Sequence, residues 1–249
     1  MRRLITLAVL AAALITPASA GAITNGSADG NRHPNVGGLV SATQYADGTW
    51  IYCSGTLISP TVFLTAAHCA ADGERVAVTF DAAYQAGDTV STGTFEADPL
   101  YNQSQSDPHD IAVVVLDSPV QGIAPARLPK ANSLSSLPRT QRFTSVGYGA
   151  YEVTNGPGGH QYLYDDVRMV ATGTLNATNK SWLRISMNPA TGNGGTCYGD
   201  SGGPNFLGNT DIVAAITITG DAVCRSTNVD YRLDTESART FLSQYVQLP

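Results

Sequence analysis

Short apolar runs separated by turn residues recur along the chain between residues 36 and 233. Several runs alternate apolar with polar positions or are rich in β-branched residues, and Gly, Pro, Asn and Asp stand between them. This pattern is typical of strands in an antiparallel sandwich or barrel. The clearest runs cover residues 55–58, 62–66, 75–80, 111–116, 144–148, 164–172 and 211–218. The sequence therefore predicts an all-β fold.

Only the C-terminal segment carries a helical pattern, which predicts one helix over about residues 235–247. Asp234 or Thr235 can accept hydrogen bonds from the first turn as the N-cap. The apolar positions that share one helical face follow i, i+3, i+4, i+7, i+8 spacing and are Ala238, Phe241, Leu242, Tyr245 and Val246.

The N-terminus has the features of a leader sequence. Arg2 and Arg3 precede an apolar run over residues 4–15, and small residues follow up to Ala22. This order predicts a secretory signal peptide over residues 1–22. Cleavage after Ala20 is the alternative and leaves residues 21–22 as a dipeptide propeptide. No segment approaches the ~20 apolar residues that a membrane span needs. We therefore expect a secreted protein that has no contact with the membrane once the leader is removed.

Charge and cysteine content restrict the possible partners. The 249 residues carry a net charge of −6, and loss of Arg2 and Arg3 with the leader makes it more negative. A chain of this charge is not expected to bind nucleic acid. Four cysteines in a secreted chain predict two disulfides, with three possible pairings. No C-x-x-C or H-x-x-x-H pattern accompanies them, so we predict no metal site.

Three short segments carry residues suited to nucleophilic catalysis. Ser201 stands in TCYGDSGGP (residues 196–204), His68 in TAAHC (65–69) and Asp110 in HDIAV (109–113). A serine hydroxyl is a weak nucleophile unless a base accepts its proton and a third group orients that base. Asp110 directly precedes an apolar run, where a buried carboxylate is costly without a partner.

Together these segments resemble the trypsin/chymotrypsin family of serine peptidases. The order His, Asp, Ser differs from that of subtilisin and the α/β-hydrolases. Residues 145–149, SVGYG, are similar to the family's VTGWG with Tyr148 for Trp. The resemblance implies two packed six-stranded antiparallel barrels, over about residues 36–128 and 140–233, with no cofactor. It also selects the disulfides Cys53–Cys69 and Cys197–Cys224.

The resemblance assigns a role to each residue of the candidate site. Ser201 attacks the scissile carbonyl, His68 acts as general base and then acid, and Asp110 orients His68. Backbone N–H groups of Gly199 and Ser201 form the oxyanion hole. Asp200 pairs with the amine of a new N-terminus at Ile23, because ITNG (residues 23–26) resembles the family's N-terminal sequence.

The substrate pocket is expected to involve residues on both sides of the nucleophile. Gly195 stands where trypsin carries its specificity acid, and Thr196 follows it. Residues 217–220 correspond to a wall of the pocket, with a register open by a residue or two. In one register Thr217 replaces the family's serine near Asp110, which places Thr219 or Gly220 at the pocket mouth. Asp230 either lies near the pocket floor, where it would select Lys or Arg, or faces away. We predict a small or apolar P1 residue.

The sequence as a whole predicts a secreted, monomeric serine endopeptidase. We expect it to cleave proteins or peptides and to be a target of protein protease inhibitors. The alternative is a catalytically silent relative that acts as a binding or adhesion protein on the same fold. His33, His109 and His160 lie outside the motifs and are predicted to be surface residues.

Overall fold

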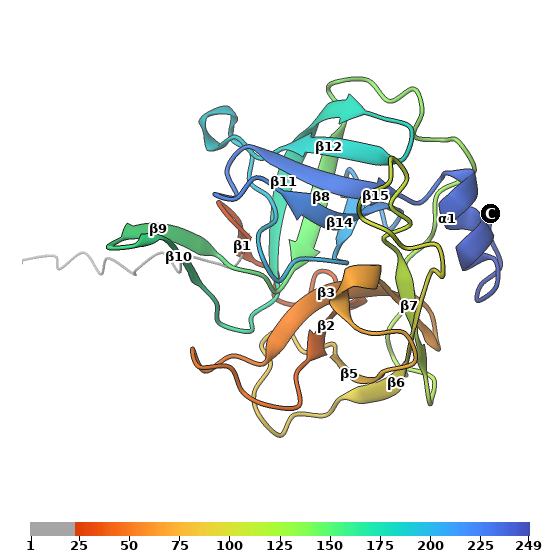
Figure 1. Cartoon of the computed structure of the whole chain (residues 1–249), viewed down its shortest axis with the longest axis horizontal. Coiled ribbons are helices and arrows are strands. Elements are labelled where there is room, and N and C mark those ends of the chain that lie inside the picture. The colour runs from red at the N-terminus through yellow and green to blue at the C-terminus, as the bar shows by residue number, and fades with distance from the viewer. Residues whose placement is uncertain (1–22) are drawn as a thin grey trace, which may run out of the picture.

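The first half of the chain closes into a six-stranded antiparallel barrel (Figure 1). The structure is a computed structural model and describes residues 23–249. Neighbouring strands follow the order β2-β3-β4-β7-β6-β5, and β5 pairs with β2 to close the barrel. The strands are β2 (Val36–Val40), β3 (Ile51–Ser59), β4 (Val62–Thr65), β5 (Arg75–Thr79), β6 (Ser91–Ala97) and β7 (Ala112–Leu116).

A second six-stranded barrel follows, in the order β11-β12-β15-β14-β13-β8, and the pairing of β8 with β11 closes it. The short strand β1 (Ser27–Ala28) adds to the outside of β11. The strands are β8 (Arg142–Gly147), β11 (Met169–Thr178), β12 (Trp182–Ser186), β13 (Pro204–Leu207), β14 (Val213–Gly220) and β15 (Thr227–Arg232). The prediction of two packed antiparallel barrels is confirmed.

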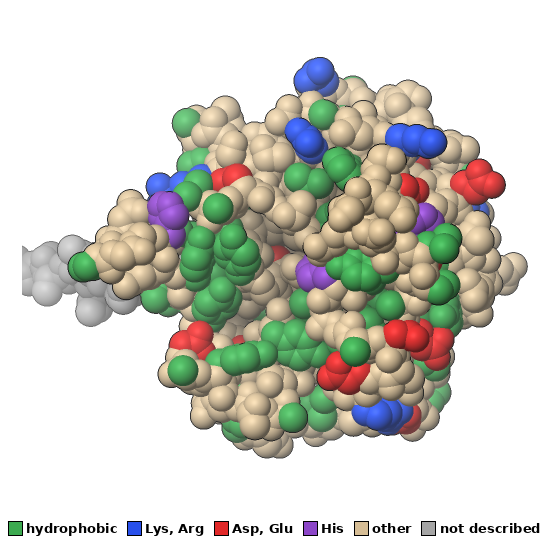
Figure 2. All heavy atoms as spheres, in the orientation of Figure 1, with side chains coloured by type: hydrophobic (Ala, Val, Ile, Leu, Met, Phe, Trp, Pro, Cys, Tyr) green, Lys and Arg blue, Asp and Glu red, His purple; other side chains and the backbone are tan. Residues whose placement is uncertain are grey.

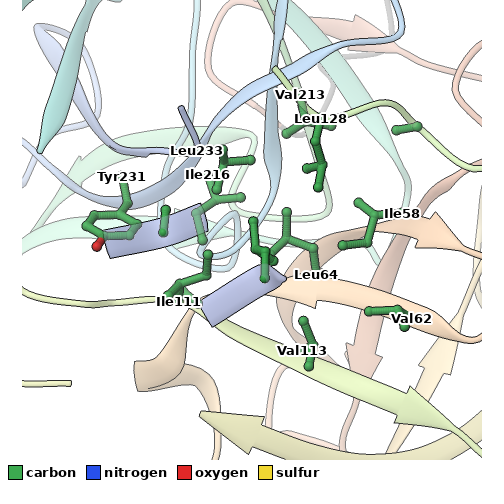
Figure 3. Close-up of a cluster of buried hydrophobic side chains, with 14 of the residues drawn as sticks. Ile58, Val62, Leu64, Ile111, Val113, Leu128, Val213, Ile216, Tyr231 and Leu233 are labelled. Atoms are coloured by element: carbon green, nitrogen blue, oxygen red, sulfur yellow. The ribbon is translucent and has the colours of Figure 1, made fainter. Parts of the chain in front are cut away.

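Strand β7 explains how the two barrels pack. Its sequence AVVVL is apolar throughout because both faces are buried. Ala112 and Val114 point into the core of barrel one, whereas Val113 belongs to the apolar cluster between the barrels. Figure 3 shows the labelled members of this cluster, which come from both barrels and their flanking segments: Ile58, Val62, Leu64, Ile111, Val113, Leu128, Val213, Ile216, Tyr231 and Leu233.

A buried polar network joins the N-terminal segment to both barrels. Arg168 is fully buried and pairs with Asp29 at 3.1 Å. It also donates to the carbonyls of Val36 at 3.0 Å and Phe80 at 2.8 Å, and to the hydroxyl of Tyr148 at 3.3 Å. The Tyr148 hydroxyl in turn donates to the carbonyl of Asp81 at 2.7 Å. Tyrosine in place of the family's tryptophan therefore supplies a hydrogen bond between the barrels.

Arg168→Met is expected to lower the free energy of unfolding by about 3–5 kcal/mol, because it removes the fully buried cation of Asp29 together with a donor to the carbonyls of Val36 and Phe80. The matched control is Arg127→Met, since Arg127 pairs with Asp211 on the surface and such pairs contribute about 0–1 kcal/mol. Urea unfolding of the two variants measures both values. Equal losses in the two variants would contradict the assignment of Arg168 as a buried structural cation.

A hairpin and a helix lie outside the barrels. Strands β9 (Glu152–Gly156) and β10 (Gly159–Leu163) pair only with each other and form a hairpin that projects from barrel two (Figure 1). Helix α1 (Glu236–Leu242) starts at the N-cap Thr235, as one of the two predicted caps allows. It is shorter than predicted, because the N–H groups of Gln244 and Tyr245 bond three residues back, which tightens the last turn out of the α-helix.

Both implied disulfides, Cys53–Cys69 and Cys197–Cys224, are confirmed. Each bond fastens a segment of the candidate site, the first at His68 and the second at the loop that carries Ser201. The predicted signal peptide, residues 1–22, lies outside the described residues. Within residues 23–249, no helix is long and apolar enough to cross a membrane.

Candidate active site

His68 and Asp110 form a hydrogen-bonded pair between the barrels. His68 lies in the 3₁₀ turn η1 (Ala67–Cys69), and Asp110 directly precedes Ile111 and β7. The His68 Nδ1 donates to Asp110 Oδ2 at 2.8 Å, and the His68 backbone N–H donates to Oδ1 at 3.1 Å. Asp110 is only 2% exposed, so the pair compensates the buried carboxylate. The geometry leaves Nε2 of His68 as the nitrogen that can accept a proton.

Ser201 and His68 line the same cavity, which has a volume of about 810 Å³. Figure 2 shows this face hollowed between the barrels, with a histidine side chain in the hollow and hydrophobic side chains along it. The backbone of the Ser201 loop is held from both barrels. The Ser54 N–H of β3 donates to the Ser201 carbonyl at 2.8 Å, and the Gly202 N–H donates to the Thr217 carbonyl of β14 at 2.8 Å.

Gly199 adopts a conformation that favours glycine, with φ of +94°. A Cβ at this position would lie 2.9 Å from the Cα of Gly149, so a side chain has no room. The carbonyl of the preceding residue, Tyr198, accepts from the Ala150 N–H at 2.8 Å. The carbonyl of Gly199 accepts from the Ser54 hydroxyl at 3.0 Å. These contacts fix both peptides on either side of Gly199.

Asp200 is fully buried directly before the serine. Its carboxylate accepts from the N–H groups of Gly149 at 2.9 Å and Cys197 at 2.8 Å. Burial raises the pKa of Asp200 to about 7, against the lowering effect of these two donors. Within residues 23–249, no side-chain cation forms a salt bridge with this carboxylate.

The segment that begins at Ile23 packs against the region that leads to Asp200. The Ile23 side chain is fully buried beside Met169 and Ala171. Thr24 pairs with Gly195, whose N–H donates to the Thr24 carbonyl at 3.0 Å. The structure thus brings residues 23–24 to the strand-like stretch five residues before Asp200.

Four of the six predicted pocket residues line the cavity: Thr196, Thr217, Thr219 and Gly220. Gly195 and Asp230 are not among the lining residues. A Cβ at Gly195 would lie 2.3 Å from Cγ of the buried Met187, so methionine occupies the space that an acid at this position would need. Residue 195 is glycine, and the structure leaves no room at this position for an acidic side chain of the kind that selects Lys or Arg.

Asp230 and the Thr217 hydroxyl belong to the interior of barrel two. Asp230 is fully buried, and its Oδ1 accepts from Asn205 Nδ2 at 2.8 Å and from Thr217 Oγ1 at 3.3 Å. Burial raises the pKa of Asp230 well above its usual range. These contacts fit the alternative in which Asp230 faces away from the pocket. They also place the Thr217 hydroxyl on Asp230, and not on Asp110 as one reading of the register expected.

Several residues of the site were not identified from the sequence. Asp221 lines the cavity, and it accepts from the N–H groups of Arg225, Ser226 and Thr227. Burial acts to raise the pKa of Asp221, and these donors outweigh it, so the pKa lies below its usual range. The sequence around Asp221 contains no motif that would have placed this residue at the cavity. Aromatic side chains also line the cavity and are Tyr45, Tyr52, Tyr164 and Tyr198.

Two of the three remaining histidines differ from their prediction as surface residues. His33 is half-buried and lies 2.5 Å from Asp29, and His109 is half-buried and lies 3.1 Å from Asp98. Only His160, on the β9–β10 hairpin, is exposed as predicted. His68 also lies close to Cys53 and Cys69, but those sulfurs are joined in a disulfide and cannot act as thiolate ligands.

A model of the trypsin family matches residues 27–241 of the chain. Glucanase inhibitor protein 3 of Phytophthora sojae is 31% identical over 176 residues, which cover 65% of this chain and 66% of that protein. A trypsin of Phaedon cochleariae is 30% identical over 176 residues, which cover 63% and 64% of the two chains. The chain thus spans just under two thirds of the length of both relatives.

A solved structure named HL collagenase has the same fold. Its TM-score is 0.69 at 20% sequence identity, with 89% of this chain and 97% of that chain covered.

Proposed function

Because the chain belongs to the trypsin family, we propose that it is a serine endopeptidase that cleaves peptide bonds through an acyl-enzyme on Ser201. The observation that carries the proposal is the buried Asp110, which holds the imidazole of His68 in the cavity that Ser201 also lines. A histidine fixed in this tautomer presents its second nitrogen to a hydroxyl, as general-base catalysis requires.

In the proposed reaction, Ser201 Oγ bonds to the scissile carbonyl carbon while its proton passes to Nε2 of His68. The carbonyl π electrons move onto oxygen, where the N–H groups of Gly199 and Ser201 stabilise the charge. The C–N bond then breaks as His68 protonates the leaving amine. Water attacks the resulting ester, with His68 again accepting a proton, and the free acid and Ser201 are released.

A fluorophosphonate probe tests this function, because it reacts only with an activated serine. We expect the wild-type protein to gain one phosphonyl group on the peptide that contains Ser201, and His68→Ala to remain unlabelled. A protein that folds and has Ile23 as its first residue but does not react would rule out the proposed activity.

We further propose that the pocket accepts a small apolar P1 side chain. Thr219 lines the cavity, and its cross-strand partner is Val229. Asn228 and Asp230 on either side of Val229 face the barrel interior, so Val229 lies on the same face of the sheet as Thr219. Of this pair only Thr219 lines the cavity, so its β-branched side chain narrows the space for a substrate side chain.

The variant Thr219→Gly is expected to shift the preferred P1 residue from Ala or Val toward Phe. The removed threonine side chain frees room for a ring, and a difference of one methylene group in a pocket is worth about 10- to 200-fold in kcat/KM. Rates on peptides that differ only at P1 measure the shift. A strong preference for Lys or Arg in the wild type would contradict the proposal and direct attention to Asp221.

Secretion and activation are proposed to be linked. The leader-like residues 1–22 end directly before Ile23, so signal peptide removal could expose the amine that pairs with Asp200. Two disulfides fit an oxidising, extracellular location. Edman sequencing of the active secreted protein tests this, and we expect Ile23 as its first residue.

A second candidate function is binding without catalysis. The relative from Phytophthora sojae is named as a glucanase inhibitor protein, which shows that the chain resembles at least one protein named for inhibition. The candidate triad of His68, Asp110 and Ser201 favours catalysis here. Absence of fluorophosphonate labelling, together with capture of a stable protein complex by the purified chain, would favour the binding function.

A further inference from the structure

Ser54 connects barrel one to the loop of the nucleophile through both its backbone and its side chain. It lies on β3 directly after Cys53 and is fully buried. Its N–H donates to the Ser201 carbonyl at 2.8 Å. Its hydroxyl donates to the Gly199 carbonyl at 3.0 Å and accepts from the Tyr148 N–H at 3.0 Å. One side chain thus bridges barrel two and the loop that bears the oxyanion-hole residues.

The loop needs such a restraint because Gly199 carries no side chain to limit its rotation. Glycine at a φ of +94° has other accessible conformations of similar energy. The peptide before Gly199 is held through the Tyr198 carbonyl by Ala150, and the peptide after it is held through the Gly199 carbonyl by Ser54. The Gly199 N–H belongs to the first peptide. Without the second contact, the peptide after Gly199 can rotate, which changes the orientation of the Gly199 N–H relative to the N–H of Ser201.

We propose that Ser54 is a positioning residue: it holds the Gly199 carbonyl, and with it the backbone torsions between Gly199 and Ser201, so that the N–H groups of both residues are directed at the oxygen that becomes charged during acyl transfer. The inference rests on the proposed serine endopeptidase function and adds a residue that the three catalytic motifs do not include. Ser54 touches neither the substrate nor the reacting atoms. It acts by orienting a hydrogen-bond donor before the reaction begins.

The contribution of such a residue falls mainly on the transition state. The ground-state carbonyl oxygen carries little charge, whereas the tetrahedral intermediate carries a full negative charge. Ser54→Ala is therefore expected to lower kcat about 10- to 100-fold and to change KM less than about twofold. A peptide aldehyde reports the same effect at equilibrium. Ser201 Oγ bonds to the aldehyde carbon, its proton passes to His68, and the former carbonyl oxygen occupies the oxyanion site.

The experiment compares Ser54→Ala with Ser145→Ala in enzyme that begins at Ile23. Ser145 is a matched control because it is also buried and hydrogen-bonded through its hydroxyl, to Asn205 at 2.5 Å, within barrel two. We expect Ser54→Ala to lose affinity for the peptide aldehyde by the same factor as kcat, and Ser145→Ala to retain wild-type kcat and aldehyde affinity within about twofold. Melting temperatures report the structural cost of each change.

Three results would overturn the inference: an unchanged kcat in Ser54→Ala, a rise in KM at constant kcat, or equal losses of activity in both variants. If Ser54→Ala fails to fold, Ser54→Gly gives a second variant that lacks the hydroxyl. If the wild type itself neither hydrolyses peptides nor reacts with the fluorophosphonate, then the proposed function fails. A wild type that does both, with Ser54→Ala equal to it, removes only the role of Ser54.

Discussion

Ser201→Ala is expected to lower kcat for peptide hydrolysis by about six orders of magnitude, because it removes the proposed nucleophile from the cavity that His68 also lines. Asp110→Asn is expected to cost about four orders of magnitude. The asparagine can still accept or donate one hydrogen bond, but it favours the wrong imidazole tautomer and does not stabilise the imidazolium. Initial rates with a chromogenic peptide measure both losses.

His109→Asn serves as the control for the Asp110 variant, since His109 is the neighbouring residue and pairs with Asp98. We expect its activity to stay within about tenfold of the wild type. The losses of Ser201→Ala and His68→Ala should not add in the double variant, because the two residues act as a unit. Additive losses would contradict a shared proton-transfer step.

Extension of the chain before Ile23 is expected to lower kcat/KM by at least about 100-fold, which is the scale of one lost oxyanion-hole donor. A blocked Ile23 nitrogen cannot supply a cation to the buried Asp200, which lies between Gly199 and Ser201, the two residues of the proposed oxyanion hole. Two forms of the protein test this, one that begins at Ile23 and one that begins at Gly21. An equally active form that begins at Gly21 would contradict the ion pair.

The pH dependence of stability gives a second readout for the extended form. Burial raises the pKa of Asp200 from 3.8 to about 7, so the folded state binds this proton more tightly than the unfolded state. The stabilisation is therefore complete below about pH 4 and is lost as pH rises through about 7, on the order of 4 kcal/mol. Asp200→Asn should remove this dependence in the extended form and should inactivate the form that begins at Ile23.

The matched control for Asp200→Asn is Asp211→Asn, because Asp211 is a surface partner of Arg127. Chemical unfolding at several pH values between about 4 and 8 measures the slopes. If Asp200→Asn leaves the pH dependence of the free energy of unfolding unchanged in the extended form, then another group controls that dependence.

The candidate catalytic residues could be picked out from the sequence because each lies in a short local motif. The motif around Ser201 is rich in glycine, and Asp110 precedes an apolar strand that is buried on both faces. Residues that lie in short local motifs of this kind can be identified from the sequence alone. The strands around the motifs, such as β4 and β7, were predicted for the same reason.

Other elements could not be predicted because their partners are distant or their faces are not apolar. The β9–β10 hairpin is largely exposed, so its residues show no alternation of apolar and polar positions. Ser54 acts on Gly199, which lies 145 residues away in the chain. The register around Thr217 was open because an irregularity between Thr217 and Thr219 shifts the pairing with β15. Thr217 stands opposite Asp230 before this irregularity, and its hydroxyl bonds to that buried carboxylate.

The acyl-enzyme itself is the most direct test of the account. A slowly deacylating p-nitrophenyl ester, mixed with the form that begins at Ile23 and quenched in acid, allows the intact mass to be measured. We expect a gain equal to one acyl group, located by peptide mapping on Ser201 and absent from Ser201→Ala. Hydrolysis of the ester without an adduct on Ser201, or an adduct on another residue, would contradict the account.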